Sequence, residues 1–191
     1  FGRERRRLFL ETLEDRHMLA TFIVNSTADA VDSNPGDGQA RTSGGLTTLR
    51  AAIMEANVTL GNNVIILNAG EFILSLAGSG EDGAASGDLD VNGDLAIVGA
   101  GANQTTINAA GIDRIFDVFS NVTFDISGVA LLGGDAGADN GGAIYNRGTI
   151  GFSNSEISNS SGANGGGIFN DGGTVSIVGS TLWNNTATAD G

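Results

Sequence analysis

A seven-residue phrase that occurs twice constrains the fold of this chain more than any other feature of its 191 residues. Residues 140–146 read NGGAIYN, and residues 164–170 read NGGGIFN. The match continues beyond the phrase, because GTI at residues 148–150 corresponds to GTV at residues 173–175. Two unrelated glycine-rich loops would not match outside the phrase. The sequence therefore contains a structural repeat of about 25 residues.

Each repeat consists of short strand patterns rather than helices. Apolar and polar residues alternate in TVSIVGS (174–180) and STLWN (180–184), and Gly, Asn and Ser separate such runs. A repeat of this length without helical segments is typical of a solenoid whose coils are spaced by roughly 4.8 Å, the distance between paired strands. We therefore predict an all-β fold, a right-handed parallel β-helix with a short N-terminal capping helix.

In such a solenoid, equivalent residues of successive coils lie on top of one another. Ile144 and Ile168 are expected to be buried and stacked in the core. Asn146 and Asn170 are expected to form an amide ladder at a corner. Tyr145 and Phe169 alternate with these residues, so we expect them to point outward as an aromatic stack and to be the candidate binding residues.

The clearest helical pattern of the sequence lies at residues 47–57, where Leu49, Ile53 and Ala56 share one face after a threonine N-cap. Because a solenoid exposes unpaired strand edges and an open core at its end, we expect this helix to cover the first coil. The predicted organisation is an export-type segment at 1–20, an N-terminal cap at 21–60 and β-helix coils at 61–191. The pattern stops within a repeat, so we expect the coils to be truncated at the C-terminus.

Composition excludes several classes of function. The sequence has no Cys and no Lys, and its one histidine, His17, has no catalytic constellation around it. From Thr21 onward, 4 Arg stand against 18 acidic residues, a charge that repels phosphate backbones, so we predict no nucleic-acid partner. No apolar run is long enough for a transmembrane helix.

The acidic stretch DLDVNGD at residues 88–94 copies the first half of an EF-hand calcium loop. That loop needs a bidentate acid at its twelfth position, which here is Gly99, and a strand pattern follows instead of a helix. We predict a turn between coils, with a looser surface calcium site as the alternative. We predict no metal ligand and no cofactor.

Four further residues, Asp113, Arg114, Asp117 and Asp125, bear on catalysis, because glycoside hydrolysis needs converging carboxylates and lyases need a base and a neutralising cation. Strand parity places Asp113 and Asp117 on one face and Arg114 on the other. No acids recur at stacked positions in the regular coils. We therefore predict no catalytic residue, and an enzyme of the polysaccharide lyase or glycoside hydrolase type stays the alternative.

Three stretches resemble signatures of exported bacterial proteins. GGAIYN and GGGIFN are similar to the repeats of the polymorphic outer membrane protein family. TTLRAAIMEAN (47–57) resembles the CSLREA-type segment that opens many secreted β-helix proteins. Residues 5–20 are similar to an LEPR-type N-terminal segment, with matches at Leu13, Glu14, Arg16 and Leu19, although the residues alone favour a solvated basic amphipathic helix.

These resemblances imply a large bacterial protein that is secreted or attached to the cell surface. We therefore expect a non-catalytic module for adhesion or for contact with matrix or carbohydrate. The expected partner is a surface polysaccharide or a protein ligand, bound at Tyr145 and Phe169.

Overall fold

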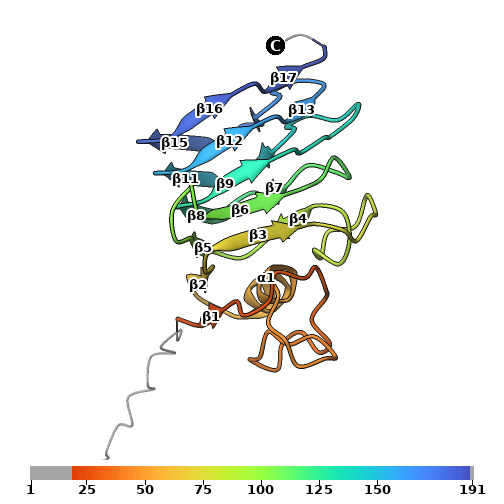
Figure 1. Cartoon of the computed structure of the whole chain (residues 1–191), viewed down its shortest axis with the longest axis vertical. Helices are drawn as coiled ribbons and strands as arrows, with labels where there is room; N and C mark the ends of the chain where they lie inside the picture. Colours follow the sequence, from red (N-terminus) through yellow and green to blue (C-terminus); the bar gives the residue numbers. More distant parts are fainter. Residues whose placement is uncertain (1–18, 190–191) are drawn as a thin grey trace, which may run out of the picture.

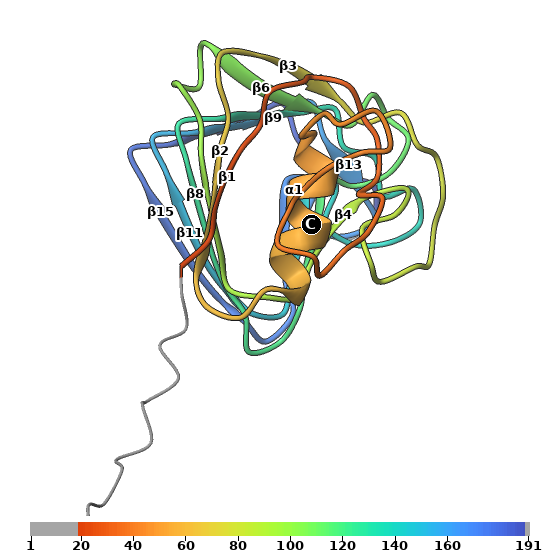
Figure 2. The same ribbon diagram turned by 90° about the horizontal axis from the view of Figure 1, so that it is seen from below.

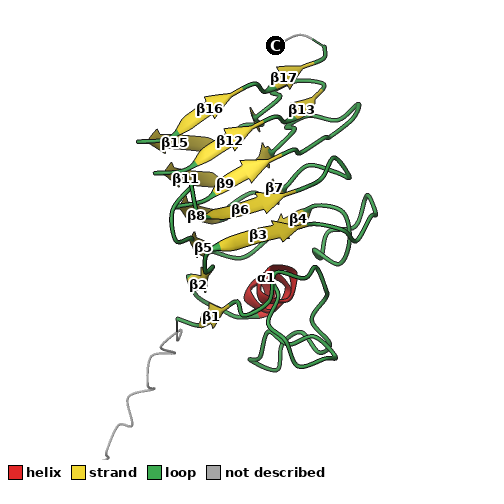
Figure 3. Cartoon of the chain, viewed as in Figure 1, coloured by secondary structure: helices red, strands yellow, loops and turns green. Residues whose placement is uncertain are grey.

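A computed structural model describes residues 19–189, which wind into a parallel β-helix (Figures 1 and 3). Strands from successive coils pair in parallel and form three sheets along the length of the molecule. The six-stranded sheet contains β1 (Thr21–Ile23), β2 (Asn63–Ile66), β5 (Leu95–Val98), β8 (Thr123–Ser127), β11 (Thr149–Ser153) and β15 (Thr174–Val178). The five-stranded sheet contains β3 (Gly70–Ile73), β6 (Thr105–Asn108), β9 (Ala130–Leu132), β12 (Glu156–Ser158) and β16 (Thr181–Trp183).

The third sheet has four strands and is the one that carries the candidate site. It contains β4 (Leu89–Val91), β7 (Phe116–Val118), β10 (Ile144–Asn146) and β14 (Ile168–Asn170). A further pair of short strands, β13 (Ser161–Gly162) and β17 (Thr186–Ala187), extends the last coils. The predicted fold class is confirmed.

The repeat phrase has the register that the sequence predicts. Ile144 pairs with Ile168, and Asn146 pairs with Asn170. Nδ2 of the fully buried Asn146 donates a hydrogen bond of 2.7 Å to Oδ1 of Asn170, so the amide ladder is confirmed. The expected burial of Ile168 is wrong: Ile144 is buried completely, but Ile168 is only half-buried because no described coil covers it.

Aliphatic and aromatic side chains from all three sheets fill the interior of the coils. Phe116 and Phe124 lie edge to face with ring centroids 5.0 Å apart, and both are fully buried. Ile97, Ile107 and Leu131 are buried in the same continuous core. Burial of this apolar surface is the main driving force for coil stacking, since each coil alone has no closed interior.

The coils turn sharply between the six-stranded and the five-stranded sheet. At this corner Gly128, Asn154 and Gly179 all have φ between 48° and 67°. The register of β8, β11 and β15 places these three residues on top of one another. Glycine and asparagine tolerate this left-handed conformation, which explains their recurrence there.

Helix α1 (Leu49–Val58) covers the N-terminal end of the coils, and Figure 2 shows it inside their outline. Thr48 is the N-cap, and its Oγ1 accepts a hydrogen bond from the N–H of Ala51. Leu49, Ile53 and Ala56 are buried in the main core, so the predicted capping position is confirmed. Thr21–Ile23, within the segment assigned to the cap, forms β1 and pairs with β2.

Several predictions lie outside the described residues. Leu13, Glu14, Arg16 and His17 belong to this part, as does most of the export-type segment at 1–20. Within residues 19–189, no helix is long and apolar enough to cross a membrane.

Candidate functional site

The outer face of the four-stranded sheet carries a straight column of four side chains. In β4, β7, β10 and β14 the first and third residues point into the coil, so the middle residue points outward. The register joins these middle residues in the order Asp90, Asp117, Tyr145 and Phe169. We call these four residues the acidic-aromatic column.

The aromatic end of the column is a parallel stack. The rings of Tyr145 and Phe169 have centroids 5.8 Å apart and an interplanar angle of 2°. The hydroxyl of Tyr145 donates a hydrogen bond of 2.6 Å to Oδ2 of Asp171. This bond to an anionic acceptor, together with partial burial, raises the pKa of Tyr145. The tyrosine therefore stays neutral and is fixed in orientation.

Two guanidinium groups connect the aromatic end to the acidic end. Nη2 of Arg147 donates a hydrogen bond of 2.8 Å to Oδ1 of Asp117. The Arg147 guanidinium also lies 4.4 Å from the ring centroid of Phe119 and 5.3 Å from that of Tyr145. Arg114 lies 5.5 Å from the centroid of Tyr145. These cation–π contacts hold both arginines against the column.

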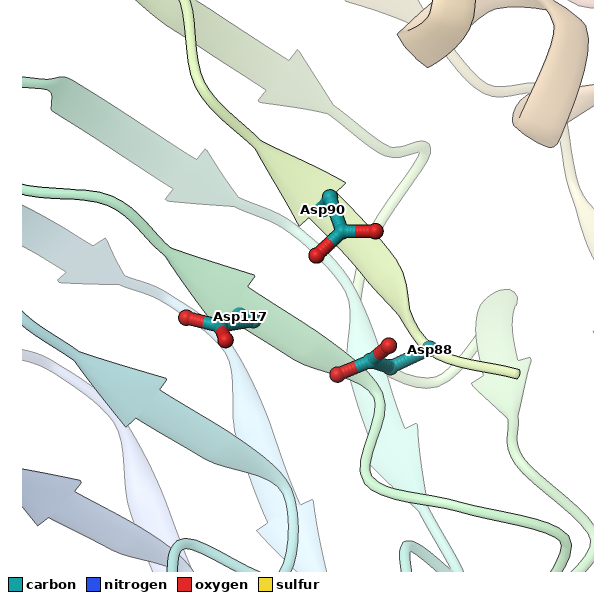
Figure 4. A group of neighbouring side chains, drawn as sticks. All are labelled: Asp88, Asp90 and Asp117. Atoms are coloured by element: carbon teal, nitrogen blue, oxygen red, sulfur yellow. The ribbon is translucent and has the colours of Figure 1, made fainter. Parts of the chain in front are cut away.

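The acidic end is a cluster of three carboxylates, Asp88, Asp90 and Asp117 (Figure 4). One oxygen from each lies within 4.8 Å of the others. Asp88 is 9% exposed and Asp90 is 1% exposed. Nε of Arg114 lies 3.1 Å from Oδ2 of Asp88, so the cluster is paired with Arg114 on one side and with Arg147 on the other.

Burial and mutual repulsion make these carboxyls hard to ionise. Burial, reinforced by the charges of Asp90 and Asp113, raises the pKa of Asp88 to about 8. Burial raises the pKa of Asp90 to about 7, against the effect of the hydrogen bond from Ala84. Burial also raises the pKa of Asp117, although Arg147 opposes the shift. The cluster therefore holds protons near neutral pH.

The loop before β4 covers this cluster. The N–H of Ala84 donates a hydrogen bond of 2.9 Å to Oδ2 of Asp90. Below the loop, the guanidinium of the fully buried Arg50 donates to the carbonyls of Ala84, Gly87 and Asp88. The capping helix, through Arg50, thus fixes the backbone that carries the acidic end of the column.

The structure brings together some of the predicted residues and separates others. Tyr145 and Phe169 are adjacent, as expected. Asp117 joins the cluster, whereas Asp113 contacts Arg114 beside it, with Oδ1 3.9 Å from Nε. Asp125 lies on the six-stranded sheet, where it pairs with Ala96 and Gly151, so it is no part of this site.

Two expectations about the acidic residues need correction. Arg114 was expected to point away from Asp113, but the two lie together because residues 111–115 form a turn, where strand alternation does not apply. The stretch 88–94 was expected to be a turn, yet Leu89–Val91 forms β4. Strand pairing then brings Asp90 against Asp117, an acidic pair that lies in the irregular coils.

Sequence reasoning missed the role of Arg50, Asp88 and Arg147. Arg50 appeared only as one letter of the CSLREA-type resemblance. The sequence contained no signal for this role, because Arg50 lies off the apolar helix face that includes Leu49 and Ile53, and the structure buries it all the same. No signal in the sequence joined Asp88 and Arg147 to the column, because loops of unequal length separate them.

No protein-family model matches the chain, and comparisons with curated proteins and with solved structures give no match either.

Proposed function

We propose that this chain is a non-catalytic binding module that contacts an extended partner, a surface polysaccharide or a protein ligand, through the outer face of the four-stranded sheet. The contact residues are Tyr145 and Phe169. The proposal includes a secreted or cell-surface location, which is supported by the three sequence resemblances.

The observation that carries this proposal is the fixed aromatic stack. Asp171 holds the hydroxyl of Tyr145, and Arg147 lies beside its ring. A partner that binds there meets side chains already held in one orientation, so little conformational entropy is lost on binding. Aromatic side chains of this kind contribute large contact areas to interfaces.

The arrangement of the acids supports binding over catalysis. A polymer in contact with the outer face cannot reach the carboxylate of Asp90, which is 1% exposed. Asp117 is engaged by Arg147, and Asp88 lies against Arg114. These contacts give the acidic end a supporting role in holding the two arginines beside the aromatic stack.

Binding is tested by titrating the chain with a panel of neutral and acidic polysaccharides and following affinity by calorimetry. The Tyr145→Ala/Phe169→Ala double variant should lose at least tenfold in affinity while its circular dichroism stays unchanged. Trp183→Ala is the matched control, because Trp183 is an exposed aromatic residue on the five-stranded sheet. An equal loss in the control, or none in the double variant, would contradict the proposal.

A second candidate function, cleavage of a polysaccharide, is favoured by one observation. Asp88, Asp90, Asp117 and Arg114 converge on one sheet, and carboxyls that hold protons near neutral pH suit general acid catalysis. It is the weaker candidate because the loop before β4 covers these groups. Release of reducing or unsaturated ends by the unmodified chain, abolished in Asp117→Asn, would establish it.

A further inference from the structure

The C-terminal end of the β-helix leaves the core of its last described coil open. Phe152 and Ile157 are 1% and 0% exposed. Their in-register partners one coil later, Ile177 and Leu182, are 44% and 40% exposed. The residue types are equally apolar, so the difference arises because none of the described residues forms a coil on top of the last one.

A cavity of about 610 Å³ occupies this open end. Its apolar lining includes Ile168, Val175, Ile177, Leu182 and Trp183. Exposed apolar surface that is continuous with a core marks a site of association. The lining includes inward-facing residues of all three sheets. An occupant that covers this lining therefore needs the cross-section of a coil.

The backbone at this end is also unsatisfied. Among the described strands, β14, β15, β16 and β17 each pair on one side only, with the preceding coil. Their other edges present rows of free N–H and C=O groups, which are templates for added strands. An occupant therefore has to supply strands at each of these edges as well as apolar side chains.

The interface between the last two described coils shows which backbone conformation a further coil would need. Gly141 and Gly165 have φ of 74° and 64° at equivalent positions of successive coils. A Cβ added at Gly142 would collide with the carbonyl oxygen of Gly166 in the next coil. The backbones approach so closely that only glycine is accommodated there.

We propose that the open end binds one further coil of the same repeat, which adds a parallel, in-register strand to β14, β15, β16 and β17. Such a coil carries aliphatic residues over Val175, Ile177 and Leu182 and glycine over Gly166. It buries the lining of the cavity in the way that the present last coil buries Phe152 and Ile157.

A second copy of the chain fits this end less well. Its N-terminal end is covered by α1, whose Leu49, Ile53 and Ala56 fill the core there. Its C-terminal end can meet the first copy only with antiparallel strands. Every pairing between the described strands is parallel, and the closely packed glycines depend on that register.

Trp183, the one tryptophan of the sequence, provides a direct probe at this end. It is 48% exposed, whereas Ser158, at the equivalent position one coil earlier, is 2% exposed. An added coil should therefore cover Trp183. The test joins a copy of residues 167–189 directly after Gly191, with leucine in place of the copied tryptophan. The matched control carries aspartate in place of the copied Ile177 and Leu182.

The added coil should shift the emission of Trp183 to shorter wavelength and lower its quenching by acrylamide at least twofold relative to the control. Hydrogen exchange of the amides of Thr174–Val178 gives a second readout, and it should slow at least tenfold in the chain with the added coil. Equal quenching and equal exchange in the two chains would overturn the proposal. Protection of Trp183 in the unmodified chain that rises with concentration, with sedimentation as a dimer, would assign this end to a second copy instead.

Discussion

Asp90 and Asp117 are in-register partners on adjacent parallel strands, with outward carboxylates side by side. Like charges at such positions repel each other, and here Asp88 adds a third. Most sheets avoid this arrangement. This cluster lies at the end of the column that begins with Phe169 and Tyr145, and it makes the stability of the fold depend on pH.

Stability should fall as pH rises toward 8. The pKa of Asp90 is raised to about 7 and that of Asp88 to about 8, against an ordinary value of 3.8. Between these limits the folded chain holds protons that the unfolded chain has released, so rising pH favours unfolding. The urea midpoint should therefore be higher at pH 5.5 than at pH 9. Asp90→Asn keeps an acceptor for Ala84 and should flatten this dependence, whereas a midpoint that rises with pH would contradict the sign.

Truncation of the stacked isoleucines should reveal where the core ends. Ile144 is fully buried between two coils, so Ile144→Ala should lower the free energy of unfolding by about 2–5 kcal/mol. Ile168 is its partner on the half-covered last coil, and Ile168→Ala should cost less because part of that side chain already contacts water. Chemical denaturation of both variants measures the difference. Equal costs would show that the last coil is covered in solution.

The regular coils could be predicted from the sequence because stacking repeats one environment per coil. The positions that match in the repeat phrase are those whose side chains contact each other in successive coils. Asn146 and Asn170, for example, are joined by a hydrogen bond at the corner of the coils. The period therefore predicted the register directly. The capping helix could also be predicted, because the spacing of its apolar residues can be recognised without knowing which residues they pack against.

The acidic end of the column could not be predicted in the same way. Asp90 and Asp117 stand in coils whose loops differ in length, so no fixed period joins them. Burial of Asp90 depends on the loop before β4, which is held by Arg50 from another part of the chain. Contacts between segments that share neither period nor pattern become visible only once the coils are stacked.

Opening of the capped end should cause self-association. Ile53 is fully buried between α1 and the first coils, so Ile53→Asp should displace the helix and expose core and strand edges. Light scattering over a range of concentrations should show larger species than for the unmodified chain. Val58→Asp serves as the control, because Val58 is 55% exposed on the same helix. An Ile53→Asp chain that stays folded and does not associate would argue that α1 protects nothing.

Removal of the Arg50 guanidinium should be among the most destabilising single changes in the chain. Arg50 is fully buried, and its Nε lies 2.6 Å from Oδ1 of Asp29. Despite burial, which acts in the opposite direction, the hydrogen bonds from Arg50 and from the N–H groups of Ser75 and Leu76 keep the pKa of Asp29 below its usual value. Arg50→Met leaves that carboxylate without its cation and three loop carbonyls without a donor. The expected cost is about 3–5 kcal/mol.

A double-mutant cycle separates the ion pair from the loop contacts. Asp29→Asn alone removes the charge but keeps an acceptor, and Arg50→Met combined with Asp29→Asn removes the unpaired charge. If the pair dominates, the double variant should be more stable than Arg50→Met in urea denaturation. If the bonds to Ala84, Gly87 and Asp88 dominate, the double variant should be no more stable. In that case the pH dependence attributed to Asp90 should also weaken in Arg50→Met, because the loop that buries Asp90 has lost its support.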